Sequence, residues 1–163
     1  MKRDRYGCGW RIQLSLIEQA IEILGIVNPV NVCVTRTMDV TTLGALDGEK
    51  SGTWQICIDR FLTPTQASLT LWHELVHVAQ AESAGGMHEL DERLDRERCA
   101  ARLDGPRKRT FFRLRAYRNL PLEREAEDRA QTLHTKLPLA TVRRRGRTRW
   151  PWVNRTPKGE IFV

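Results

Sequence analysis

The chain has 163 residues, of which 40% are hydrophobic, which is enough for one core of moderate size and too few for two. No apolar run approaches the roughly 18 residues of a membrane span, and residues 1–8 lack the apolar stretch of a secretion signal. We therefore expect a cytoplasmic protein without a membrane partner. Most of the formal net charge of +7 lies beyond residue 140, which predicts one domain at 1–140 and a basic tail at 141–163.

The N-terminal part of the domain has one helix pattern followed by strand patterns. Residues 12–24 carry apolar side chains at helical spacing, and residues 30–34 alternate as a strand does. Residues 41–46 and 53–59 flank a segment rich in turn-forming residues, which predicts a β-hairpin. We expect three alternating side chains of the second hairpin strand to face the core: Trp54, Ile56 and Ile58.

The next segment carries the signals of a helix at both ends. Thr63 precedes Pro64, and Gln66 completes a capping box, while Gly85 and the glycine after it supply the stop. Apolar residues occur on more than one side of this helix, so we expect it to be buried.

The middle of this helix contains His73-Glu74-Leu75-Val76-His77. Residues i and i+4 lie one turn apart, so the imidazoles of His73 and His77 can bind one ion, with Glu74 beside them. Zinc accepts neutral imidazole, and its catalytic sites keep three protein ligands and one open position. A bound zinc ion lowers the pKa of water toward about 7, and Glu74 could take the proton as water attacks a carbonyl. The alternative is a chance HExxH sequence on a charged surface helix.

Residues 87–109 are highly charged, and we interpret them as an irregular insertion. A second helix is predicted from about Asn119 to Leu137, just before Pro138. Its apolar stripe consists of Leu122, Ala126, Ala130, Leu133 and Leu137.

Two acids of this helix are candidates for a third ligand. Glu123 is the acid nearest to the apolar stripe, whereas Glu125 lies about 200° away around the helix. Arg129 follows Glu125 at i+4, a spacing typical of an exposed ion pair. We therefore predict Glu123, with Glu125 as the alternative.

The segments 73–80 and 117–126 together resemble small gluzincin-type zinc metallopeptidases, including short HExxH domains from bacteria and phages. The resemblance implies an α+β, zincin-like fold, with a small twisted sheet packed on the HExxH helix and a following glutamate helix. It also implies Zn²⁺ as cofactor and a peptide or protein as substrate. His73, His77 and Glu123 would bind the metal, and Glu74 would be the general base.

Within this resemblance, Glu123, Ala126 and Glu127 match the ExxA(D) pattern of CAAX-processing zinc proteases, with Glu127 in place of the usual Asp. An acid at Glu127 could hold a histidine in position. Tyr117 is a candidate transition-state stabiliser, with a packing role as the alternative. The strand at 53–59 could pair with an extended substrate, as in zincins, or be an ordinary sheet strand.

The four cysteines, Cys8, Cys33, Cys57 and Cys99, form no CxxC pair, and we expect free thiols. The tail mixes arginine with Trp150 and Trp152, a composition suited to phosphate contacts and base stacking. Two alternatives to a plain peptidase follow. The tail could recruit the protein to nucleic acid, or the domain could be an inactive zincin with a structural role.

If the tail arginines contact phosphates, deletion of residues 141–163 should abolish nucleic-acid binding. The log K of the intact protein should fall with log salt by about 0.7 to 0.9 per phosphate contact, as measured by fluorescence anisotropy. Binding that survives the deletion, or no binding at low salt, would remove this hypothesis.

Overall fold

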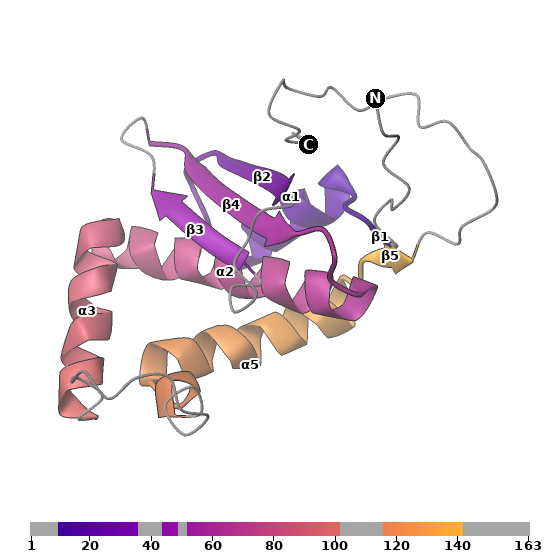
Figure 1. Ribbon diagram of the computed structural model, residues 1–163. Helices are drawn as coiled ribbons and strands as arrows, with labels where there is room; N and C mark the ends of the chain where they lie inside the picture. Colours follow the sequence, from indigo (N-terminus) through magenta and orange to yellow (C-terminus); the bar gives the residue numbers. More distant parts are fainter. Residues whose placement is uncertain (1–9, 36–43, 49–51, 102–115, 142–163) are drawn as a thin grey trace, which may run out of the picture.

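The computed structural model describes residues 10–35, 44–48, 52–101 and 116–141 (Figure 1). The architecture is α+β, as the sequence predicts. Its elements in chain order are β1 (Trp10–Arg11), α1 (Leu14–Leu24), β2 (Val30–Thr35), β3 (Gly44–Gly48), β4 (Trp54–Asp59), α2 (Pro64–Ala84), α3 (Met87–Ala100), α5 (Pro121–Lys136) and β5 (Ala140–Thr141).

The main sheet has three strands in the order β2-β4-β3. β4 pairs with β2 in parallel and with β3 in antiparallel orientation, so the predicted hairpin is confirmed. Its first strand extends through Gly48, which pairs with Trp54. Burial alternates along β4, and the three side chains predicted to face the core are buried: Trp54, Ile56 and Ile58.

Because β4 is the central strand, both of its edges are already hydrogen-bonded to neighbouring strands. Of the two alternatives for residues 53–59, the structure therefore shows the ordinary sheet strand and excludes pairing with a substrate. The sequence does not reveal strand order, and the hairpin alone leaves one edge of this strand open. In the structure β2 occupies that edge, and β3 and β2 form the outer strands.

The parallel register also places Cys33 directly opposite Cys57, with their Cα atoms 4.7 Å apart. This distance suits a disulfide, and the structure pairs the two residues in one. The expectation of free thiols is wrong for this pair, because the pairing depends on strand order. Disulfides are typical of oxidising compartments, and the prediction of a cytoplasmic location does not account for this one.

Helix α2 forms the central layer of the domain. It packs against β3 and β4 on one side and against α5 on the other (Figure 1). Its side chains are buried around most of its circumference, among them Leu71, Trp72, Leu75, Val76 and Val78. Both predicted ends are confirmed: Thr63 and Gln66 form the capping box, and Gly85 ends the helix in a left-handed conformation at φ 105°.

Helix α5 packs along α2 through the predicted apolar stripe, which is buried in full. The small side chains of Ala126 and Ala130 belong to this buried stripe. Near the far end of α5, His134 Nδ1 lies 2.8 Å from Oγ of the buried Ser68 on α2. The two helices are therefore joined by both apolar packing and a polar contact.

The irregular insertion predicted for residues 87–109 is wrong over its first part, which forms helix α3. Leu90 and Leu94, one turn apart, are buried and attach this helix to the core, while its other faces are mainly charged. Two apolar positions give too weak a periodic pattern for a prediction from sequence. Residues 102–109 lie outside the described residues.

β1 and β5 join the two ends of the domain, with Trp10 opposite Thr141. A truncation that spares this pair must begin at Val142, and the tail from that residue onward lies outside the described residues. No helix in the described part of the chain combines the length and apolar character that crossing a membrane requires.

A single carboxylate connects α2 with the turn before β2 and with β4. Glu82 accepts hydrogen bonds from the backbone N–H groups of Val27 and Asn28, at 2.8 and 2.9 Å, and from the indole of Trp54, at 2.9 Å. Partial burial opposes ionisation, but these donors outweigh it and lower the pKa of Glu82.

We therefore predict that Glu82→Ala lowers the free energy of unfolding by about 1 to 2 kcal/mol at neutral pH. The folded pKa lies below the unfolded one, so this difference should shrink as the pH falls through the folded pKa. Urea denaturation at several pH values measures it. Glu127→Ala, at an exposed position of α5, serves as control and should change stability by less than about 0.5 kcal/mol. Equal effects of the two variants would contradict the role of Glu82.

Candidate metal centre

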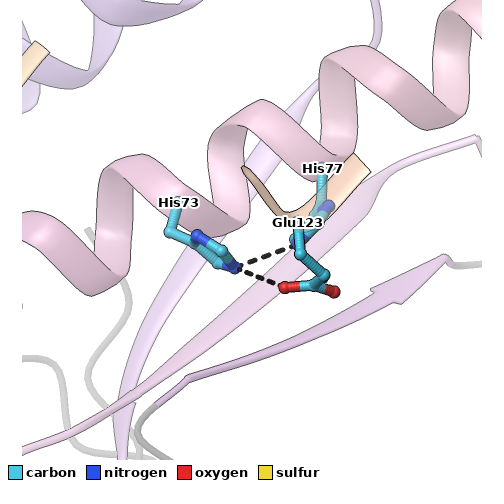
Figure 2. Close-up of side chains that lie close together, drawn as sticks. All are labelled: His73, His77 and Glu123. Carbon is cyan, nitrogen blue, oxygen red and sulfur yellow. Dashed lines mark hydrogen bonds and ion pairs between the residues drawn. The ribbon is translucent and has the colours of Figure 1, made fainter. Parts of the chain in front are cut away.

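Three side chains from two helices converge at the contact between α2 and α5. Figure 2 shows His73 and His77 projecting from the same face of α2 toward Glu123, which comes from the first turn of α5. The two imidazole Nε2 atoms are 3.0 Å apart. Glu123 Oε2 lies 3.4 Å from Nε2 of His73, and Glu123 Oε1 lies 3.7 Å from Nε2 of His77.

These separations suit a tetrahedral cation. With metal–ligand bonds of about 2.0 to 2.1 Å and tetrahedral angles, neighbouring ligand atoms should lie about 3.4 Å apart. The observed distances are 3.0 Å between the two imidazole nitrogens and 3.4 and 3.7 Å from these nitrogens to the two oxygens of Glu123, which is close to that value. Two imidazole nitrogens and one carboxylate therefore form a candidate metal site, with the donor types that zinc accepts.

Glu123 carries the negative charge of the site. Burial disfavours its ionised form, but the neighbouring His73 and His77 and the hydrogen bond from Tyr117 outweigh burial and hold its pKa far below the usual range. For His77, burial opposes the charged form and Glu123 favours it, with a raised pKa as the result. The carboxylate is therefore ionised at neutral pH, as a metal ligand must be.

The predicted alternative, Glu125, lies outside this group. Its side chain is 48% exposed, and its Oε1 accepts a bond of 3.1 Å from Arg129. This is the exposed i,i+4 ion pair that the sequence predicts. Glu123, whose side chain is 6% exposed, is the acid that faces the histidines.

Glu74, the predicted general base, follows His73 on α2 and has an intermediate burial. Burial raises its pKa, and the neighbouring His77 and His73 oppose that rise without cancelling it. A raised pKa suits a carboxylate that accepts and returns a proton. Its role in catalysis remains a prediction.

Tyr117 lies at the edge of the group and contacts a candidate ligand. Its hydroxyl donates a 2.5 Å hydrogen bond to Oε1 of Glu123. Burial is the main cause that raises the pKa of Tyr117 to about 12, and the interaction with Glu123 is the second. The hydroxyl therefore keeps its proton and remains a donor. The described contacts therefore give Tyr117 a polar role next to the site instead of packing alone.

Gln80 is a residue of the site that the sequence reasoning missed. Its Oε1 lies 2.7 Å from Nδ1 of His77 and takes the role of histidine partner that the sequence suggested for Glu127. Glu127 is exposed, so that suggestion is wrong. Gln80 is on the same helix as His77, three residues on, and that spacing in the sequence could have identified it.

Helix α3 supports the start of α5 from the side. Glu97 accepts a 3.2 Å hydrogen bond from the backbone N–H of Leu122, which has no partner within α5. The guanidinium of Arg98 lies 5.2 Å from the centre of the Tyr117 ring. Both contacts involve residues beside Glu123, and nothing in the local sequence pattern indicated them.

No protein-family model, curated protein or solved structure matches this chain.

Two matched substitutions test the assignment of the third ligand. We expect Glu123→Ala to lower zinc affinity by orders of magnitude, because it removes the only carboxylate of the group. Glu125→Ala should lower zinc affinity far less, because that carboxylate contacts Arg129 and Gln80 and neither ligand histidine. Metal analysis after identical dialysis measures both. The reverse result would move the ligand to Glu125, and equal retention of zinc by both variants would rule out a two-histidine, one-glutamate site.

Proposed function

We propose that this protein is a zinc-dependent metallopeptidase of the small gluzincin type, which hydrolyses peptide bonds with a metal-activated water. The observation that carries the proposal is the convergence of His73, His77 and Glu123, with donor separations of 3.0 to 3.7 Å, around an HExxH motif. The motif on α2 and the glutamate on the following α5 have the arrangement that the resemblance implies.

The donor set favours zinc and an open coordination position. Catalytic zinc sites use three protein ligands, whereas structural zinc sites are closed by four, often with thiolates. The group contains three donors and no cysteine. The His73 side chain is 23% exposed, more than those of its two partners, so the approach for water and substrate lies on its side of the site.

The proposed chemistry divides among a few side chains. A bound zinc ion would lower the pKa of the water bound to it and polarise the substrate carbonyl. Glu74 would take a proton from the water as its oxygen attacks the carbonyl carbon, and would return it to the amine nitrogen when the C–N bond breaks, a role that its raised pKa supports. The ionised Glu123 compensates the charge of the cation, and the Tyr117 hydroxyl holds the Glu123 carboxylate in place.

The proposed substrate is an extended peptide or protein segment. Since β4 is central, we propose that such a segment pairs with β3, an outer strand that packs on α2. Main-chain hydrogen bonds along an outer strand provide affinity with little sequence selectivity. Nucleic-acid recruitment by the tail remains a separate proposal.

The most direct functional test separates metal binding from proton transfer at Glu74. Glu74→Gln keeps the shape of the side chain but cannot accept the proton, so we expect about one zinc per chain and a peptidase rate lower by roughly 10² to 10⁴. A quenched peptide library measures turnover, and metal analysis of the same sample measures zinc.

His73→Ala is the matched control, because it should lose both zinc affinity and turnover. Loss of zinc by Glu74→Gln to the same degree would show that Glu74 is a ligand. A wild-type protein that binds zinc and cleaves no peptide in the library would favour the alternative of an inactive zincin with a structural role.

A further inference from the structure

The contacts of Gln80 determine which way its amide group points. Its Nε2 lies 3.1 Å from the backbone carbonyl oxygen of Leu122 and 3.1 Å from Oε2 of Glu125. Both of these partners only accept hydrogen bonds, the second as a carboxylate, so the NH₂ group must face them. The amide oxygen then faces His77, and it too can only accept.

This orientation determines the position of the proton on His77. Because Oε1 of Gln80 accepts at 2.7 Å, Nδ1 of His77 must be the protonated nitrogen. A neutral imidazole with its proton on Nδ1 carries its lone pair on Nε2, the atom that points toward His73 and Glu123. The contact thus selects the tautomer that can bind a metal through Nε2.

The same amide also connects the two helices that carry the ligands. Gln80 and His77 are on α2, whereas Leu122 immediately precedes Glu123 on α5. The second acceptor, Glu125, is held in turn by Arg129. One buried side chain therefore fixes a ligand of α2 relative to the backbone next to the ligand of α5.

We propose that Gln80 is a positioning residue, which holds His77 as the Nδ1–H tautomer and sets the distance between His77 and Glu123. The proposal depends on the proposed metal site but not on peptidase activity. Partners of this kind typically change metal affinity 10- to 100-fold when they are removed. It also assigns a function to Glu125, which orients Gln80 without approaching the metal.

The test compares three variants of the full chain. Gln80→Leu removes the acceptor and both donors at similar volume. Gln80→Glu combined with Glu125→Gln restores an acceptor for His77 and a donor from residue 125 across the helix contact, while the carbonyl oxygen of Leu122 loses its donor. Gln131→Leu is the matched control, because Gln131 lies exposed on α5.

Zinc affinity, measured by competition with a chromophoric chelator, is the first readout. We expect Gln80→Leu to bind zinc about 10- to 100-fold more weakly than the wild type. The double variant should recover to within about tenfold of the wild type, and Gln131→Leu should equal it. Circular dichroism and thermal unfolding establish that each variant is folded.

Long-range ¹H–¹⁵N NMR spectra, recorded before and after zinc addition, are the second readout. Before zinc is added, and at a pH above the pKa of His77, they should show His77 protonated at Nδ1 in the wild type and the double variant, and a mixture of tautomers in Gln80→Leu. After zinc is added, every variant that binds zinc through Nε2 should carry the proton on Nδ1. The ring of His134, which contacts Ser68, is an internal reference that should not change.

Two results would overturn the proposal. One is a folded Gln80→Leu variant that binds zinc within about threefold of the wild type. The other is equally weak binding by Gln80→Leu and the double variant with His77 still protonated at Nδ1 in both, which would reduce Gln80 to a structural contact between helices. If Gln80→Leu and the wild type both bind zinc but cleave no peptide, the proposed peptidase function is wrong. The difference in zinc affinity between the two proteins then still tests the positioning role of Gln80.

Discussion

The structure depends on holding two imidazole nitrogens 3.0 Å apart in a largely buried place, with the two oxygens of one carboxylate 3.4 and 3.7 Å from them. Such atoms repel unless a proton or a cation lies between them, so the surrounding packing has to impose the arrangement. The i,i+4 spacing on α2 brings the histidines together. The packing of α5, whose apolar stripe is buried, against α2 brings Glu123 to them.

The rest of the domain holds this helix pair in a fixed position. The sheet covers the opposite side of α2, and Glu82 connects α2 with the turn before β2 and with β4. On the other side, α3 places Glu97 at the start of α5 and Arg98 against Tyr117. Geometry that is determined before the metal binds is what a catalytic site needs, because no rearrangement is then required.

The parts of the fold and site that could be predicted from sequence are those with local signals. Helical periodicity and end signals predicted α2 and α5, and the HExxH spacing predicted that His73 and His77 converge. The angle around α5 correctly separated Glu123 from Glu125. In each case the signal lies within a single helix and its two ends.

The parts that could not be predicted depend on contacts between distant segments. The central place of β4 and the disulfide between Cys33 and Cys57 both follow from strand order, which no local pattern encodes. In helix α3 only Leu90 and Leu94 are fully buried, and most of the other residues are charged, so its sequence shows no clear helical pattern. Gln80 has a local relation to His77, but its two other partners come from α5.

X-ray absorption at the zinc edge of the purified, zinc-loaded protein tests the central claim most directly, because it reports the ligand atoms themselves. The account predicts a first shell of four nitrogen and oxygen atoms at about 2.0 to 2.1 Å, with the outer-shell scattering of two imidazole rings. A sulfur shell at about 2.3 Å, scattering from fewer than two imidazoles, or failure to take up zinc would contradict it.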